Sequence, residues 1–271
     1  MSKLFDYSLK DIIKSYKKLK IKRNEDVYIS SNLISLGRYE KKSNNHLLED
    51  HLIAIRSVIG NKGTIFFPTA TLNLCNPNTI FDYHNTPSYQ MGILSEYLRK
   101  KKNSFRSIHP YWSVSGIGPN AKKFLKNLSP HSHASGSIWE KFAEKNIRAI
   151  NIGVKPTHAC PIIHYIETIV GVPYRYNREF NQRIKINKIK NKKFYLPALY
   201  LKSKIIRDKN KKIFKNFELN KKEIKKIKLG KGFIYSFSQK DFFIITKNYL
   251  QNNIYGWTKN EPKIKPYTKI M

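Results

Sequence analysis

The sequence predicts an α/β fold, with a largely buried mixed β-sheet that is flanked by helices on both faces. Short apolar runs rich in β-branched and aromatic residues alternate with longer stretches of helical spacing, which is typical of that class. Of the 271 residues, 40% are apolar and 13% aromatic, enough to bury a sizeable core. Because there is no internal repeat and no long linker, residues 1–271 are predicted to form a single domain.

The first part of the chain alternates between helix and strand. Apolar residues recur at helical spacing behind Ser8, a residue type that is favoured at helix N-caps. Gly60 ends a second amphipathic stretch, and Pro68 ends a second apolar run. The predicted elements are a helix over 8–19, a strand over 27–29, a helix over 46–59 and a strand over 64–67.

Helix-start signals mark the middle of the chain. Thr86 before Pro87 predicts a helix start, because proline is favoured at the first helical position. Residues 118–120 (Gly-Pro-Asn) predict a turn from a strand into a helix. Ser137 and Glu140 have the spacing of a capping box, which predicts another helix from there to about residue 145.

The stretch 147–175 reads as a strand, a polar loop and a helix. Apolar residues over 147–152 predict a buried strand closed by Gly153, and the helix is expected to open near Pro161 and to stop at Gly171. Beyond residue 176 the signals are weaker. They predict a strand over 194–201, a basic helix over 217–227, a strand over 232–237 and a helix over 241–250.

His164 and Glu167 are the first candidate catalytic residues. Their spacing of three residues places both side chains on one face of the predicted helix. An imidazole titrates near neutrality, and a carboxylate beside it can orient the ring and stabilise its charged form. Such a pair also occurs by chance on many helices, so the spacing alone favours a structural contact.

The net charge of +34 makes nucleic-acid binding a competing hypothesis. The lysines are scattered among Asn and Ile along the whole chain, and no zinc-finger spacing, RNP-like motif or helix-turn-helix is visible. Charge alone supports only non-specific binding, so the sequence does not favour nucleic acid as the main partner.

A cytoplasmic protein is expected. No apolar run is long enough to cross a bilayer, and the N-terminal residues contain no secretory apolar region. Cys75 and Cys160 give neither a disulfide framework nor a metal-ligand spacing, so no metal is predicted.

Several motifs together resemble the aminoglycoside 3-N-acetyltransferase (antibiotic N-acetyltransferase) family. The most specific is R-S-x-H-P-x-x-S-V-x-x-x-G-P over residues 106–119. Residues 30–37 (S-S-x-L-x-x-L-G), 68–71 and 81–92 resemble further family segments, and 153–175 carries G-V-x(9)-H-x-x-E followed by V-P-Y-R. The resemblance covers roughly residues 27–175. One departure is Pro161, where the family often has threonine.

The resemblance implies an α/β fold of this family's type, not of the GNAT type, whose phosphate loop is missing here. It implies acyl-CoA as co-substrate, carrying an acetyl or hydroxyacyl group, and no metal. The hydroxyls and the arginine of residues 106–119 suit an anionic cofactor. The site residues expected are His164 and Glu167 for catalysis, Ser30, Ser31, Arg106, Ser107, Ser113 and Val114 for the cofactor, and Asp82, Tyr83, Ser88 and Arg175 for the acceptor.

The expected chemistry is acyl transfer to a primary amine with His164 as base and Glu167 orienting it; His158 is next in line. Backbone N–H groups near Ser30, or the Thr71 hydroxyl, are expected to stabilise the oxyanion. A covalent route through Cys160 is a minor alternative, since no base is visible beside it.

The acceptor divides the hypotheses. A basic chain with only 18 acidic residues suits an anionic acceptor, and the resemblance permits a nucleotide-linked amino deoxysugar of surface-glycan (lipopolysaccharide or O-antigen) synthesis. An aminoglycoside is the alternative acceptor.

Overall fold

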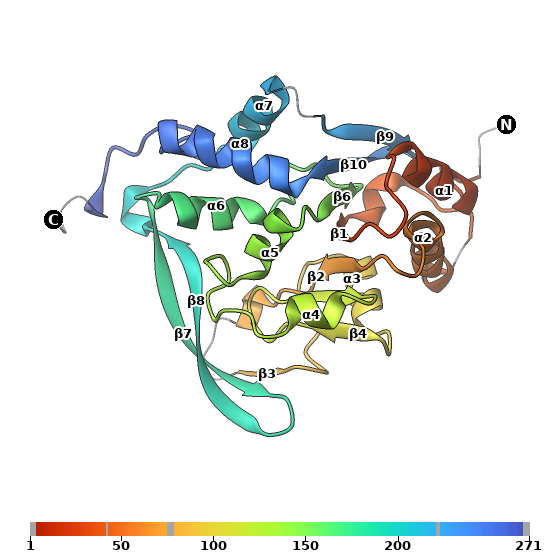
Figure 1. Cartoon of the computed structure of the whole chain (residues 1–271), viewed down its shortest axis with the longest axis horizontal. Coiled ribbons are helices and arrows are strands. Elements are labelled where there is room, and N and C mark those ends of the chain that lie inside the picture. Colours follow the sequence, from red (N-terminus) through yellow and green to blue (C-terminus); the bar gives the residue numbers. More distant parts are fainter. Residues whose placement is uncertain (1–3, 42, 75–78, 221–222, 268–271) are drawn as a thin grey trace.

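A seven-stranded mixed sheet forms the centre of the molecule (Figure 1). The computed structural model describes residues 4–41, 43–74, 79–220 and 223–267. The strand order is β4-β5-β2-β1-β6-β10-β9; β1 pairs in parallel with β2 and β6, and the outer strands add in antiparallel. The strands are β1 Val27–Ser31, β2 Ile65–Pro68, β4 Ser104–Arg106, β5 Val114–Ile117, β6 Arg148–Ile152, β9 Lys225–Leu229 and β10 Gly232–Ser238.

Helices cover both faces of this sheet, which confirms the predicted fold class. Val27 and Ile29 of β1 pack into one apolar cluster, whereas Tyr28 between them packs into another, because successive strand residues point to opposite faces. The first cluster contains side chains of α1 Leu9–Lys18, α2 Asn44–Ile59 and α3 Ile93–Arg99. The second contains side chains of α4 Ala121–Leu125, α5 Ile138–Glu144, α6 Ile162–Val170, α7 Lys211–Leu219 and α8 Gln239–Asn252.

A second sheet of three strands, in the order β3-β7-β8, is built on a long hairpin (Figure 1). Its strands are β3 Ile80–Asp82, β7 Arg175–Lys185 and β8 Ile189–Leu199. Phe81, Ile184 and Phe194 pack with Tyr111 in a separate apolar cluster. The sequence did not predict β7, since most of its residues are polar and exposed, and β8 begins earlier than the predicted strand over 194–201.

One predicted helix start is wrong, and one predicted capping box is not formed. No helix begins at Thr86, because its hydroxyl accepts the Asp82 N–H (2.8 Å) and closes a turn; the helix begins at Ile93. Ser137 is the N-cap of α5, but its hydroxyl makes no capping bond. Glu140 reaches back to accept the Gly136 N–H instead (2.7 Å).

The predicted basic helix over 217–227 is also wrong. Helix α7 ends at Leu219, and Lys225–Leu229 is strand β9, whose Ile227 pairs with Ile234 of β10. Lys-Lys-Ile-Lys-Leu alternates with the period of a strand, and pairing with β10 decides its conformation. In the described part of the chain, no helix is both long and apolar enough to cross a membrane. Short 3₁₀ turns lie at Leu33–Leu36, Leu72–Leu74 and Leu201–Ser203.

Candidate active site

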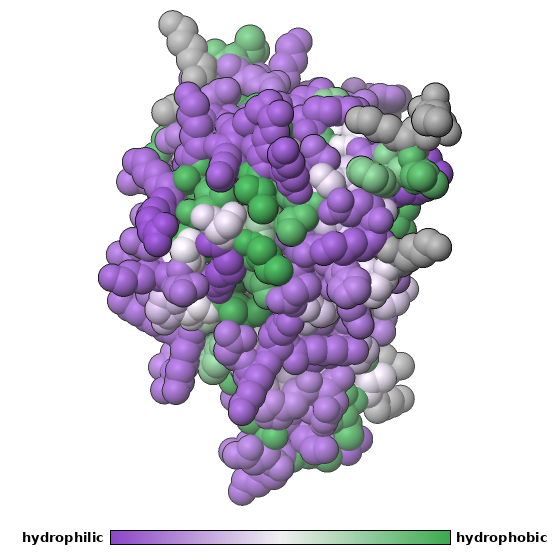
Figure 2. Space-filling view, turned by 90° about the vertical axis from the view of Figure 1, so that its right-hand side faces the viewer, coloured by the Kyte–Doolittle hydropathy of each residue, from purple (hydrophilic) through white to green (hydrophobic). Residues whose placement is uncertain are grey.

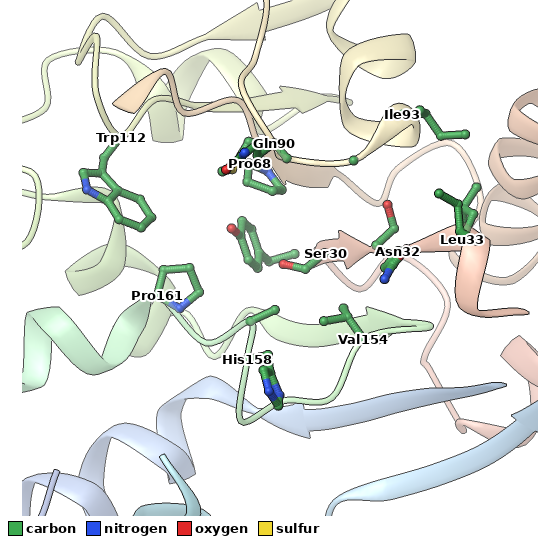
Figure 3. A pocket seen from close by; sticks show the side chains of 16 residues that line it. Ser30, Asn32, Leu33, Pro68, Gln90, Ile93, Trp112, Val154, His158 and Pro161 are labelled. Carbon is green, nitrogen blue, oxygen red and sulfur yellow. The ribbon is translucent and has the colours of Figure 1, made fainter. Parts of the chain in front are cut away.

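A cavity of about 440 Å³ opens at the carboxyl end of β1 (Figure 3). The chain leaves β1 towards β2 on one side and later returns to form β6 on the other side. Loops that leave neighbouring parallel strands in opposite directions create a crevice, the usual ligand site of such sheets. The cavity is lined by Tyr28, Ser30, Ser31, Asn32, Leu33, Ile34, Pro68, Gln90, Met91, Gly92, Ile93, Trp112, Val154, His158, Ala159 and Pro161.

Ser30 and Ser31, both predicted to bind the cofactor, line this cavity. Gly92 allows the chain to approach β1 closely, because a Cβ there would lie 2.6 Å from the Ser31 carbonyl oxygen. Its φ of +89° also favours glycine. In Figure 3, Leu33 and Ile93 lie at one end of the cavity, and Trp112 and Pro161 at the other. The lining therefore combines apolar surface with a few polar groups.

His164 lies directly behind the Trp112 end. Its backbone N–H donates to the Pro161 carbonyl (3.1 Å), and the centroids of its ring and the Trp112 indole are 6.3 Å apart. Helix α6 carries His164 in its first turn because Pro161 stands at its N-cap and the apolar residues of the helix are buried in the core. The predicted pair is formed: His164 Nδ1 is 2.7 Å from Glu167 Oε2.

Glu167 is fully buried and held from three sides. Besides His164, the Tyr174 hydroxyl donates to its Oε1 (3.0 Å), and Arg175 Nε lies 2.8 Å from its Oε2. Burial acts to raise the Glu167 pKa, but the charge of Arg175 and the bond from His164 outweigh it and hold the pKa below its usual value. Because an ionised carboxylate only accepts, His164 Nδ1 carries the proton and Nε2 is left as the basic nitrogen.

The surroundings of His164 favour the neutral form of its ring. Burial lowers its pKa below 6.5, and the bond to Glu167 offsets this only in part. Three aromatic rings surround it edge-on: Trp112, His133 (5.5 Å between centroids) and Trp257 (6.0 Å). A side chain that is 23% exposed and neutral can accept a proton from a bound group.

Two arginines add positive charge beside His164. Arg175, predicted to bind the acceptor, has its guanidinium over the Trp257 ring at 4.4 Å, and Arg207 lies over the same ring at 5.8 Å. Both charges act to lower the His164 pKa. Glu167 is the carboxylate in direct contact with His164, so the described surroundings of this histidine carry more positive than negative charge.

The four residues of the 106–119 motif that were predicted to bind the cofactor lie inside the protein and do not line the cavity, although Trp112 of the same motif does. Arg106 is 4% exposed, and its guanidinium donates to Ser113 Oγ and to the Thr69 and Thr86 carbonyls (2.6–3.1 Å). Ser107 Oγ accepts the Val114 N–H (3.0 Å). These contacts fix the strand ends around residue 69, so the geometry gives Arg106, Ser107, Ser113 and Val114 an internal role and does not support direct contact with a cofactor.

The other predicted acceptor residues hold the loop before α3. Asp82 accepts the His84 and Asn85 N–H groups (3.0 and 3.1 Å). The Tyr83 hydroxyl accepts the Arg106 N–H (3.1 Å), and the Ser88 hydroxyl donates to Glu96 (3.0 Å). None of Asp82, Tyr83 and Ser88 lines the cavity. Their polar groups are used by the loop, so the geometry does not support their role in the acceptor site.

Three alternative candidates can be placed as well. The Thr71 hydroxyl is buried and donates to the Pro110 carbonyl. Cys160 is 5% exposed, and burial raises the pKa of its thiol, which disfavours the nucleophilic thiolate. His158 is exposed at the cavity, with Nδ1 3.0 Å from the Thr157 hydroxyl. Cys75 lies outside the described residues, among which no cluster of metal-ligand side chains occurs.

Sequence reasoning missed the aromatic surroundings of His164. Trp112 lies inside the 106–119 motif, whereas His133 and Trp257 reach the site from distant parts of the chain. His109 helps to position Trp112, since its Nδ1 accepts the backbone N–H of Trp112 (3.2 Å). Trp112 stands at an unspecified position of that motif, whose match could have drawn attention to it, but nothing in the sequence signals the contacts of His133 and Trp257.

Comparison with known proteins finds aminoglycoside acetyltransferases both among sequence relatives and among solved structures. Aminoglycoside N(3)-acetyltransferase III of Salmonella sp is 24% identical over 184 residues, which are 62% of this chain and 62% of that protein. The chain thus spans less than two thirds of the length of the curated relatives it matches. A structure of AAC-IIIb with CoASH superposes with a TM-score of 0.76 at 14% identity, over 94% of this chain and 99% of that one.

A structure of the aminoglycoside acetyltransferase AAC(3)-IVa in complex with a gentamicin superposes with a TM-score of 0.75 at 16% identity, over 95% of this chain and 93% of that one. At such identities the superpositions establish a shared fold. The family model for aminoglycoside 3-N-acetyltransferase matches residues 29–251, which include the cavity lining except Tyr28, the His164–Glu167 pair and most of both sheets. The chain therefore belongs to the aminoglycoside 3-N-acetyltransferase family.

Proposed function

We propose that the protein transfers an acyl group from acyl-CoA to the primary amine of a sugar. The observation that carries this proposal is a neutral histidine, paired with a buried carboxylate, beside the end of an elongated cavity at the sheet switch point. Family membership supports the same reaction class. The finer proposal is that the acceptor is a nucleotide-linked amino deoxysugar of surface-glycan synthesis.

The cavity suits the pantetheine arm of CoA. That arm carries amide groups on an alkyl chain, and the lining alternates apolar side chains with Ser30, Asn32 and Gln90. The lining contains no lysine or arginine, so the phosphates belong outside it, where Lys155 is exposed next to the lining residue Val154. Acyl-CoA supplies an activated thioester, whose acyl end would lie towards Trp112 and His164.

His164 acts as general base in this proposal. An ammonium is not a nucleophile, so the acceptor must give up a proton, and His164 Nε2 is the nitrogen that can take it. Glu167 keeps the proton on Nδ1 and stabilises the imidazolium that forms. Because the Thr71 hydroxyl already donates to Pro110, the polar groups of the Ser30–Ser31 segment are the better candidates to stabilise the oxyanion.

The charge around His164 supports an anionic acceptor. Arg175 and Glu167 offset each other's charge in their ion pair, which leaves the positive charge of Arg207, over the Trp257 ring, beside the histidine. A polycationic acceptor needs carboxylates, whereas phosphate groups are suited to arginine. The net charge of +34 attracts anions at long range as well.

An aminoglycoside is the second candidate acceptor, favoured by the family and by the gentamicin complex of a structural neighbour. The deciding experiment measures CoA release with acetyl-CoA or hydroxyacyl-CoA and either dTDP- or UDP-linked amino sugars or gentamicin-type aminoglycosides. We expect turnover with the nucleotide sugars alone, lost in His164→Ala. Turnover with aminoglycosides alone would replace the finer proposal. Failure to bind CoA in calorimetry, together with tight DNA binding, would favour the remote alternative of a basic nucleic-acid-binding protein.

A further inference from the structure

The tip of the β7–β8 hairpin exposes apolar side chains at one end of the molecule. The hairpin extends away from the seven-stranded sheet in Figure 1, and Figure 2 shows hydrophobic among hydrophilic residues at the same lower end. Ile186 is 38% exposed and Ile189 is 47% exposed. Both lie at or next to the turn that joins the two strands, a place that does not need large apolar side chains.

A groove of about 390 Å³ lies on one face of this tip. Its lining consists of Ile184, Ile186, Asn187, Lys188, Lys190 and Lys192. Ile184 is directly opposite Lys190 in the strand pairing, so both project from the same face, and Ile184 is 2% exposed. The groove thus has an apolar floor and a rim of lysines.

The lysines on this face are unneutralised, unlike those on the opposite face. On the opposite face, Lys193 pairs with Glu179 (3.0 Å) and Lys185 with Asp82 (3.3 Å). Within the described ranges, Lys188, Lys190 and Lys192 make no side-chain hydrogen bond or ion pair. Lysines on an edge strand also prevent strand addition, but that function requires no exposed isoleucines beside them.

We propose that this groove and the flanking isoleucines bind the anionic lipid headgroups of a membrane surface. Three free ammonium groups complement phosphate-bearing headgroups, and two isoleucines at the tip can enter the boundary between headgroups and acyl chains. A nucleic acid would use the lysines but not the aliphatic side chains, because its backbone offers only charge and sugar. The contact orients the protein on the membrane without any spanning segment.

The test is co-sedimentation of the full chain with vesicles of phosphatidylcholine alone or of phosphatidylcholine with phosphatidylglycerol. We expect binding only to the second kind, weakened by salt. The triple variant K188E/K190E/K192E should bind at least about 100-fold more weakly, since each lysine near an anionic surface contributes about a factor of five. Ile186→Ser should also weaken binding.

A matched control makes the same charge change on helix α1, where Lys10, Lys14 and Lys17 are also exposed beside apolar residues. K10E/K14E/K17E should lose much less affinity for the anionic vesicles than K188E/K190E/K192E does. Equal or greater loss in this control would overturn the proposal, as would absence of binding by the wild type. Undiminished vesicle binding by Ile186→Ser would also overturn the proposal. It would indicate that the lysines alone make the contact, as they would with nucleic acid. Turnover with soluble substrates should be unchanged in all these variants, so failure here leaves the proposed reaction untouched.

Discussion

Replacing Glu167 by glutamine tests the proposed base most directly. The substitution keeps the shape of a side chain that is fully buried, but removes the charge that holds His164, Tyr174 and Arg175 together. Removing one partner of a buried ion pair costs about 3–5 kcal/mol of unfolding free energy. Loss of a correctly held general base lowers turnover by about 10²–10⁴-fold. We expect both effects in Glu167→Gln, measured by urea unfolding and by CoA release.

The pH dependence separates the catalytic effect from the structural one. Glu167 raises the His164 pKa against the effect of burial, so its neutral replacement should lower that pKa further. The acidic limb of kcat/KM should therefore move to lower pH, while the plateau falls because a weaker base remains. Glu49→Gln is the control, since Glu49 also forms an ion pair, with Lys101 (2.8 Å), but its side chain is 42% exposed. A stable Glu167→Gln protein with unchanged plateau and unchanged limb would refute the dyad, and His158 would be the next candidate.

Three further predictions follow from charge and burial. Raising the ionic strength should raise the acceptor KM if the acceptor is anionic; a flat or falling KM would instead indicate a polycation. Cys160→Ala should keep near wild-type turnover, because burial raises the pKa of this thiol, and a loss of more than about tenfold in a folded variant would revive the covalent route. Burial lowers the pKa of His51 and of His109 to about 4, so below pH 6.5 the unfolded chain binds protons that the folded protein does not. The free energy of unfolding should therefore fall by about 2 kcal/mol per histidine between pH 7.5 and pH 5. Equal free energies of unfolding at the two pH values, measured by urea unfolding, would contradict this.

Local patterns in the sequence predicted much of the central sheet and the pairing of His164 with Glu167. The spacing of His164 and Glu167 was enough to place both on one helix face, and the 2.7 Å contact confirms that they pair. Their catalytic role remains a prediction. The strands near Val27 and Ile147 are apolar and short, so both could be predicted from their composition, and Gly153 marked the end of the second.

Features that depend on distant contacts could not be predicted in this way. A motif such as residues 106–119 constrains positions without showing which way a side chain points, and Arg106 is turned inward to bind the Thr69 and Thr86 carbonyls. Strand β7 is polar and is defined by pairing with β3 and β8. His133 and Trp257 reach His164 only through the tertiary fold.

The position of β1 in the middle of the sheet has a consequence for synthesis of the chain. Its neighbour β6 is made much later, and the loops that follow β1 and β6 are joined by a bond from Ser35 to the Gly153 carbonyl, 118 residues apart. Until the ribosome has delivered β6, one edge of an apolar strand stays unpaired. Long-range pairing of this kind is slow, so we expect the nascent chain to be most prone to aggregate before Ile152 emerges.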